Sequence, residues 1–316
     1  MAAPLAPAGR RAPDSLRTHR SAVVRGGRPG EPRRVAYLYI LPALLVFGLF
    51  VLVPLVRTAQ FSLYEWNGLG ASTWAGLSNY RDLFTEPQLR GAFVHALVLV
   101  VFYAVIPVLL GLLLAAAMSR AVLRGMGFFR VVLFLPQVIP MVVVAIAWRQ
   151  IYEPNGPLND TLRFVGLDSL ARPWLGDYTW ALPSVGIVGT WVGTGLCLVL
   201  FLAGMSRIPR ELYEAARLDG AGALREFRAI TLPSLRGELA VALTLTVIAA
   251  LKTFDLVYVM TSGGPGTETT VPSYQVYNNA FLLGRVGIAT ALAVVLTLVV
   301  FVATVLINRV GERGQR

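Results

Sequence analysis

The sequence predicts an all-α polytopic membrane protein, and three observations support that fold class. Hydrophobic residues make up 56% of the 316 residues, and the mean hydropathy is +0.65. Charged residues make up only 14%, about half the share found in ordinary soluble domains. The hydrophobic residues are also gathered into six long runs. Such a chain has more apolar surface than a soluble core of its size needs, so we expect it to lie in a lipid bilayer.

The six runs are the predicted transmembrane helices. A helix needs about 20 mostly apolar residues to cross the hydrocarbon core of a bilayer. Runs of this kind occupy residues 37–56, 92–118, 131–148, 181–205, 239–260 and 287–307. The third run is the shortest and contains Pro136 and Pro140, which membrane helices tolerate when neighbours satisfy the freed carbonyl groups. We therefore expect six spans within a transmembrane domain of residues 35–308.

Arginine is concentrated in alternate loops, and this sets the orientation of the predicted spans. The formal charge is +11, and Lys252 is the only lysine. Eight arginines precede the first run, three lie between the second and third, six between the fourth and fifth, and three follow the sixth. The intervening loops hold four, and the remaining three, Arg57, Arg149 and Arg285, lie at the ends of the runs. Because an excess of Lys and Arg marks cytoplasmic loops, we expect both termini in the cytoplasm. The basic charge thus indicates topology, and we expect no nucleic-acid partner.

The two ends of the chain are predicted to be cytoplasmic tails. Residues 1–34 are rich in Arg, Pro, Gly and Ala and lack apolar periodicity, so we expect a disordered basic tail beside the anionic inner leaflet. About 34 polar residues before a full-length span do not resemble a cleavable signal peptide, and the first run should remain as an anchor. Residues 309–316 are the predicted C-terminal tail.

Cysteine and histidine are too few for a disulfide framework or a metal centre. The chain has one cysteine, Cys197, and two histidines, His19 and His95. We expect Cys197 to pack inside a helix bundle, as free cysteines usually do. No cofactor is expected on this chain.

The longest predicted cytoplasmic loop, residues 206–238, reads as two short helices joined by a turn. Pro209 suits a first helical turn, Gly220 and Gly222 end that helix, and a second helix runs to Pro233.

One face of the first helix carries small residues. Leu212, Ala215 and Ala216 share this face, while Arg210 and Arg217 are available for acidic partners. The residues alone leave two interpretations equally open: a docking element, or an amphipathic loop lying in the headgroup layer.

Four segments resemble one protein family. The loop contains Glu214-Ala215-Ala216, three residues, Gly220, nine residues, Ile230, one residue and Leu232-Pro233, which matches the EAA motif of permease subunits of bacterial ABC importers. The other segments resemble the carbohydrate branch of that family, the maltose and glycerol-3-phosphate type: GLSNYRDLF at 76–84, RGMGFFRVVLFLPQVIP at 124–140 and LKTFDLVYVMTSGGPGTET at 251–269. The resemblance covers nearly everything after residue 35.

The resemblance implies the MetI-like, type I ABC importer permease fold with a cytoplasmic EAA coupling helix. In similar permeases this helix sits in a groove of an ATPase, so the implied coupling residues are Leu212, Glu214, Ala215, Ala216, Arg217 and Gly220. The implied partners are a second permease, an ABC ATPase dimer that holds ATP and Mg²⁺, and an extracytoplasmic solute-binding protein. This chain is not expected to be an ATPase, because a P-loop requires Gly-Lys and its only lysine follows Leu251.

The solute path is expected among the fourth and fifth runs. Gly189, Gly193 and the neighbouring Trp191 combine open space with an aromatic surface, although small residues also serve ordinary helix packing. Lys252 and Asp255 are three residues apart and could form an ion pair on one helical face, with a structural, gating or solute-binding role. In a similar permease whose bound sugar is known, the contacts align with Gly189, Val192, Gly193, Leu196, Thr246, Ala249, Ala250 and Thr253.

The outer loops, residues 68–91 and 153–178, hold Trp74 and Trp174 and mixed charges. We expect these loops to contact the solute-binding protein.

Two other classes of membrane protein fit the sequence less well. An ion-driven secondary transporter would need several buried carboxylates or histidines, and Asp255 is the only carboxylate in the predicted spans. An intramembrane enzyme would need a nucleophile with a base, or a metal site, and neither is present in the predicted spans. The sequence identifies neither the sugar nor whether the pore is a homodimer or a heterodimer.

Overall fold

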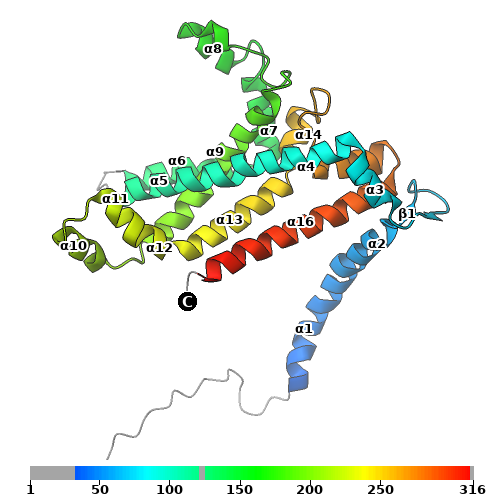
Figure 1. Ribbon diagram of the computed structural model, residues 1–316, viewed down its shortest axis with the longest axis horizontal. Coiled ribbons are helices and arrows are strands. Elements are labelled where there is room, and N and C mark those ends of the chain that lie inside the picture. Colours follow the sequence, from blue (N-terminus) through cyan, green and yellow to red (C-terminus); the bar gives the residue numbers. More distant parts are fainter. Residues whose placement is uncertain (1–32, 121–124, 314–316) are drawn as a thin grey trace, which may run out of the picture. The chain divides into compact units, whose positions relative to one another are not determined.

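The structure is a computed structural model that describes residues 33–120 and 125–313 (Figure 1). The predicted tail of residues 1–34 therefore lies outside the described residues except for its last two. The chain divides into two units, Met1–Val53 and Pro54–Arg316. In the first unit, helix α1 (Arg33–Phe47) leads into the π-helical turn η1 (Gly48–Leu52).

The second unit begins with helix α2 (Val53–Phe61) and an outer loop that folds back on itself. Strands β1 (Tyr64–Glu65) and β2 (Thr73–Trp74) pair antiparallel, with Tyr64 opposite Trp74. Helix α3 (Ser78–Thr85) follows. The buried Asn79 amide donates to the carbonyl oxygens of Ser62 at 2.9 Å and Tyr64 at 3.0 Å. These bonds give the segment 76–84 a structural role, because they fasten α3 to the end of α2.

The second span is one long helix with a π-helical turn in its middle. Helix α4 (Pro87–Val100), turn η2 (Val101–Val105) and helix α5 (Ile106–Arg120) are continuous. The segment Pro87–Ser119 has the length and hydropathy of a membrane span. It begins five residues before the predicted boundary because Pro87 occupies the first turn, where its missing N–H costs nothing.

The third predicted span is not a straight helix. Helices α6 (Met126–Val138) and α7 (Met141–Ile151) are bent by 98° at the break between them. Pro140 has no N–H to continue the helix, and it holds Ile139 in an extended conformation (ψ 132°). The predicted span over residues 131–148 therefore corresponds to a bent pair of helices, and Pro140 lies at the break between them. Beyond α7, α8 (Pro157–Phe164) and the 3₁₀ turn η3 (Asp168–Leu170) form an outer loop.

The fourth span, α9 (Ala181–Met205), has the predicted bounds. The following loop contains two short helical segments joined by a turn, as predicted. The first segment is α10 (Arg210–Leu218). The second comprises α11 (Ala223–Glu226), η4 (Phe227–Thr231) and α12 (Leu232–Ser234).

The fifth predicted span is interrupted. Helix α13 (Arg236–Leu251) ends nine residues before the predicted boundary, and the short helix α14 (Asp255–Met260) follows after a break of three residues. Helix α15 (Pro272–Tyr277) and turn η5 (Asn278–Leu282) then lead to the last span.

The last span, α16 (Val286–Arg313), is longer than predicted. The residues of the predicted C-terminal tail, 309–316, continue this helix as far as Arg313. Among the described residues, five helices are long and apolar enough to cross a membrane, or six if the bent pair α6–α7 counts as one span.

Helix α9 is the centre of the second unit, where it packs against α5, α6 and α13, and α13 packs in turn against α16 and α4 (Figure 1). Small residues allow these approaches: a Cβ atom at Gly111 would lie 2.5 Å from Cys197 Cβ, and one at Gly186 2.5 Å from the Phe102 ring. Cys197 is fully buried, which confirms its predicted packing role.

Contacts between distant segments join the ends of the spans at the side opposite α10. The Glu86 carboxylate pairs with both terminal nitrogens of the Arg285 guanidinium, one of them at 3.2 Å, and this hydrogen bonding raises the pKa of Arg285. The imidazole of His95 hydrogen-bonds through Nδ1 to the carbonyl oxygen of Thr270 at 2.9 Å. Together they tie α4 to α16 and to the loop before α15.

Gly111→Ala should destabilise the bundle. The added methyl group would overlap Cys197 and the backbone of Leu198, and overpacking of this kind costs about 1–3 kcal/mol. We expect a lower midpoint of thermal unfolding in detergent. Gly91→Ala in α4 is the matched control, since its Cβ would meet nothing within 4 Å. Equal midpoints for the two variants would contradict the proposed packing.

Candidate functional site

Gly220 ends helix α10 in a conformation that only glycine adopts without strain. Its φ is +76°, and the N–H groups of Gly220 and Ala221 donate to the carbonyl oxygens of Arg217 at 3.0 Å and Ala216 at 2.9 Å. This pair of bonds is the Schellman motif of a helix C-terminus. The turn between the two helical segments of the loop therefore depends on this glycine.

Two side-chain contacts hold the segments together across that turn. Arg217 Nε donates to Glu226 Oε1 at 2.9 Å, and Glu226 is only 3% exposed. The Tyr213 hydroxyl hydrogen-bonds to Thr231 Oγ1 at 2.9 Å. The prediction that Arg217 is available for an acidic partner was wrong, because its guanidinium is paired within the loop. Tyr213, Glu226 and Thr231 were missed because contacts across a turn leave no helical spacing in the sequence.

The side of α10 that faces away from these contacts is open: Leu212 and Ala215 are exposed, and Ala216 is half-buried. Glu214 is also exposed, at the edge of a groove that Tyr213, Arg217 and Glu226 line as well. Within the described part of the chain, the Glu214 side chain has no hydrogen bond or ion pair. The Arg217–Glu226 and Tyr213–Thr231 contacts therefore hold the loop together, while the carboxylate of Glu214 stays accessible beside Ala215 and Ala216.

A second feature is a cavity of about 350 Å³ within the bundle. Nine of the residues predicted for the solute path line it: Gly189, Val192, Gly193, Leu196, Thr246, Ala249, Lys252, Thr253 and Asp255. Trp191 and Ala250 do not. Trp191 packs edge-on against Trp148 at a ring distance of 5.6 Å, and Ala250 is fully buried in the core. Both were predicted for the solute path, and neither contributes to the lining of this cavity.

The cavity lies where the spans depart from regular helix. Gln137 and Met141, on either side of the 98° bend, both line it. Lys252, Thr253 and Phe254 form the break between α13 and α14 and line it too. Irregular backbone at membrane depth is tolerated where it is buried in protein or lines a water-filled space. The turn η2, the bend between α6 and α7 and the break between α13 and α14 therefore all contribute residues to the lining of this cavity.

Tyr103 comes from η2 and was missed by the sequence analysis. Its ring packs directly on Gly189, and its hydroxyl accepts a hydrogen bond from Thr253 Oγ1 at 3.4 Å. No periodicity in the second run distinguishes Tyr103 from its neighbours. π-Helical turns often mark functional sites, and this one carries a tyrosine into the cavity lining.

Lys252 and Asp255 do not form the predicted pair. Helix α13 ends at Leu251 and α14 begins at Asp255, so the two residues are not on one continuous helical face. Both are exposed and line the cavity, and the ion pairs among the described residues do not include them. The cavity lining therefore carries one positive and one negative charge.

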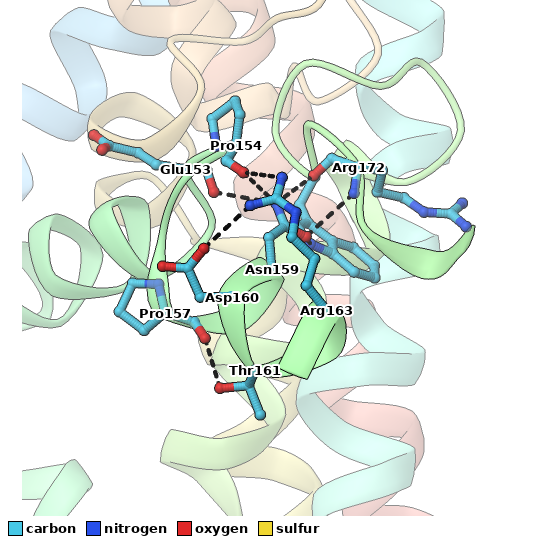
Figure 2. Close-up of polar contacts among 9 residues, drawn as sticks. Glu153, Pro154, Pro157, Asn159, Asp160, Thr161, Arg163 and Arg172 are labelled. Atoms are coloured by element: carbon cyan, nitrogen blue, oxygen red, sulfur yellow. Dashed lines mark hydrogen bonds and ion pairs between the residues drawn. The ribbon is translucent and has the colours of Figure 1, made fainter. Parts of the chain in front are cut away.

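A third feature is the outer loop around α8, which is organised by one buried side chain (Figure 2). Asn159 Oδ1 accepts hydrogen bonds from the Arg172 N–H at 3.2 Å and from Trp174 Nε1 at 2.9 Å. Asn159 Nδ2 donates to the carbonyl oxygens of Arg172 at 2.9 Å and Glu153 at 3.1 Å. The two ends of the loop are thus joined through Asn159, and Trp174 has a structural contact.

The tip of this loop is apolar and exposed. Phe164 is 91% exposed, and Val165, Leu167 and Leu170 are also exposed. The Arg163 guanidinium, next to these residues, donates hydrogen bonds to Asp160 Oδ1 at 3.1 Å and to the carbonyl oxygen of Pro154 at 3.0 Å. A rigid support beneath exposed apolar side chains is typical of a protein-contact surface.

Residues 107–313 match the family described as binding-protein-dependent transport system inner membrane component. The chain belongs to this family. It is therefore a permease, a multi-pass inner-membrane protein whose ATPase is a separate subunit, and the resemblance found through the EAA motif is confirmed.

Several relatives of the permease are similar over nearly their whole length. It is 39% identical to the probable ABC transporter permease protein YurN of Bacillus subtilis, over 89% of this chain and 97% of the relative. It is 35% identical to the diacetylchitobiose uptake system permease protein NgcF of Streptomyces coelicolor, over 92% and 88%.

A solved structure shares the fold of the permease. A chain of a bacterial ABC transporter involved in the import of the acidic polysaccharide alginate superposes with a TM-score of 0.77 at 25% identity, covering 89% of this chain and 96% of that one. The predicted all-α importer permease fold is thus confirmed.

Gly220→Ala in the permease should loosen the end of α10. A side chain at φ +76° is strained by about 1 kcal/mol even though a Cβ there would meet nothing within 4 Å. We expect faster amide hydrogen exchange in residues 210–221. Gly222→Ala is the matched control, because its Cβ space is equally open and its φ is −77°. Equal acceleration in both variants would argue against the capping role.

Proposed function

We propose that this permease forms one half of the membrane pore of an ATP-driven, binding-protein-dependent sugar importer that works by alternating access. The observation that carries the proposal is the cavity at which all three irregular segments meet. Its lining provides hydroxyl, amide and charged groups among apolar side chains, a mixture suited to a polyhydroxylated solute. Relatives named for trehalose/maltose and lactose transport are 33% and 31% identical to the chain, which supports a sugar as the solute.

We assign the solute path to the cavity lining. Thr246, Thr253 and Tyr103 offer hydroxyl groups, and Lys252 and Asp255 offer one charge of each sign. Gly189 and Gly193 have no side chains that would project from α9 into the cavity. Val192 and Leu196 of α9 and Ala249 of α13 form the apolar part of the lining. A second permease, by our proposal a different chain, supplies the rest of the pore.

The open side of α10 is the proposed contact for the ATPase dimer, on which ATP and Mg²⁺ would be held. Glu214 provides the charge, and Leu212, Ala215 and Ala216 form a face that another backbone can approach closely. Arg217 and Gly220 act indirectly, because they hold α10 at a defined angle to the second segment. When the ATPase dimer closes on ATP, α10 and the second segment of the loop would then move together, because these contacts hold them to each other.

The grouping of the loops supports an orientation with both termini in the cytoplasm. Arg130, from the loop between the second and third spans, lines the same groove as Arg210 of α10. Asn308 and Gly311, near the end of α16, line another groove with Arg207. Three of the four arginine-rich segments are therefore at one end of the bundle, the end that the positive-inside rule assigns to the cytoplasm.

The outer loops are the proposed docking surface for a solute-binding protein. The alginate importer has been solved in complex with an alginate pentasaccharide-bound periplasmic protein, and its permease superposes on this chain with a TM-score of 0.76. The braced tip of the α8 loop, with exposed Phe164, is well suited to such a contact.

Glu214→Lys should release the ATPase. The change reverses the unpaired charge on α10, so affinity purification of the tagged permease from its native membrane in gentle detergent should recover a second six-span protein but no ATPase. Wild type should recover both. Glu268→Lys is the matched control: it makes the same change at an exposed carboxylate in the loop between α14 and α15, and the ATPase should be retained. Solute flux through the isolated wild-type chain without ATP would instead indicate a secondary transporter.

Charge reversal at Asp160 and Asp168 should separate docking from assembly. Asp160 is exposed beside Arg163 at 3.1 Å, and Asp168 begins η3 near the apolar tip. With both replaced by Lys, we expect the binding protein to lose its stimulation of ATP hydrolysis in proteoliposomes while all subunits still co-purify. Undiminished stimulation and uptake would contradict docking at this loop.

A further inference from the structure

Five aromatic side chains form a continuous row on the outer side of the break in the fifth span. We name Phe254, Tyr258, Tyr274, Tyr277 and Phe281 the outer aromatic row. Phe254 stacks on Tyr258 at a centroid distance of 5.1 Å, Tyr258 meets Tyr277 at 5.3 Å, and Tyr277 meets Phe281 at 5.5 Å. Tyr274 flanks Tyr258 at 6.4 Å. Phe254 also meets Tyr277 at 5.6 Å, so Phe254, Tyr258 and Tyr277 contact one another, and Tyr274 and Phe281 extend the row from them.

The row arises from helical spacing on two elements. Phe254 and Tyr258 are four residues apart at the start of α14, and Tyr274, Tyr277 and Phe281 follow each other at three and four residues along α15 and η5. Residues at these spacings share one helix face. The aromatic face that includes Phe254 and Tyr258 contacts the face that includes Tyr274 and Tyr277, so the two short sets of rings form one row.

The inner end of the row opens on the cavity. Phe254 lines the cavity beside Lys252 and Asp255. At the other end the rings are accessible, since Tyr258 is 41% exposed and Phe281 is 75% exposed. A molecule that touches the exposed rings could therefore pass along them to the cavity without crossing a purely aliphatic surface.

An aromatic belt at the membrane surface is the other role that exposed tyrosines commonly have. Belt residues face lipid headgroups. Charged side chains in spans almost always face the bundle interior or water, and Lys252 and Asp255 line the cavity with Phe254. The inner end of the row thus faces the aqueous path, which favours contact with a solute over contact with lipid.

We propose that the outer aromatic row is a binding track on which the rings of an oligosaccharide stack before the sugar enters the cavity. The proposal rests on the proposed function and narrows its substrate class. The carbon-bound hydrogens on a sugar ring form an apolar face that packs on an aromatic face, while the tyrosine hydroxyls can hydrogen-bond to its hydroxyl groups. Because the row has several rings in series, it favours a chain of sugars over a single one.

The test uses the assembled importer in proteoliposomes with its ATPase and binding protein, and measures uptake of maltose, maltotetraose, diacetylchitobiose and tetra-acetylchitotetraose. Tyr258→Leu and Tyr277→Leu keep apolar bulk but remove the ring faces. For the family of sugars that is imported, we expect the KM for the tetrasaccharide to rise about fivefold per ring, and the KM for the disaccharide to change less.

Phe301→Leu is the matched control, because Phe301 is also exposed but lies on α16, away from the row. It should leave both KM values as in wild type. Unchanged uptake in the row variants, an equal effect on both sugar lengths, or loss of the second permease from the purified complex would overturn the track and leave the proposed importer in place. Failure of wild type to import any of the four sugars would overturn the proposed sugar cargo, and the track with it.

Discussion

Lipid cannot hydrogen-bond to a peptide group, and the architecture of the second unit follows from this constraint. Regular helix is the only economical backbone inside a bilayer, so each departure from it needs protein or water as a partner. The second, third and fifth spans depart from it at η2, at the bend before Pro140 and at the break after Leu251. All three contribute to the lining of one cavity. The places where the helices are interrupted are therefore also the places that can contact a polar solute.

The loop between α9 and α13 meets a different requirement under the proposed coupling role, in which it would transmit movement between an ATPase and the spans. Its two segments are fastened by the left-handed Gly220, the Arg217–Glu226 ion pair and the Tyr213–Thr231 hydrogen bond. None of these groups is on the open side of α10. The loop can thus be stiff without using the side chains that a partner needs, which is consistent with a lever between an ATPase and the spans.

Local patterns in the sequence were reliable where one helix determines the outcome. The bounds of α9, the two-segment loop and the role of Gly220 as a helix terminator follow from apolar runs and turn residues that act over a few positions. Patterns were less reliable where a helix breaks. The fifth apolar run resumes after Lys252, Thr253 and Asp255, so hydropathy averaged over a whole span did not reveal that α13 ends at Leu251. Trp191 and Ala250 do not line the cavity although their neighbours do, since the position of a residue around its helix decides which side chains face a cavity.

The sequence by itself determined that this chain is a polytopic membrane protein of the importer-permease family, because hydropathy, arginine bias and the EAA motif depend only on residue order. Tertiary structure alone decided which side chains meet. Tyr103 reaches Thr253 across 150 residues of chain, and Asn159 joins the two ends of an outer loop. Such contacts depend on how helices pack, and packing is set by the combined shapes of several segments. The paired Arg217 and the unpaired Lys252 illustrate the difference, since both are basic residues in the sequence and only the fold gives one of them a partner.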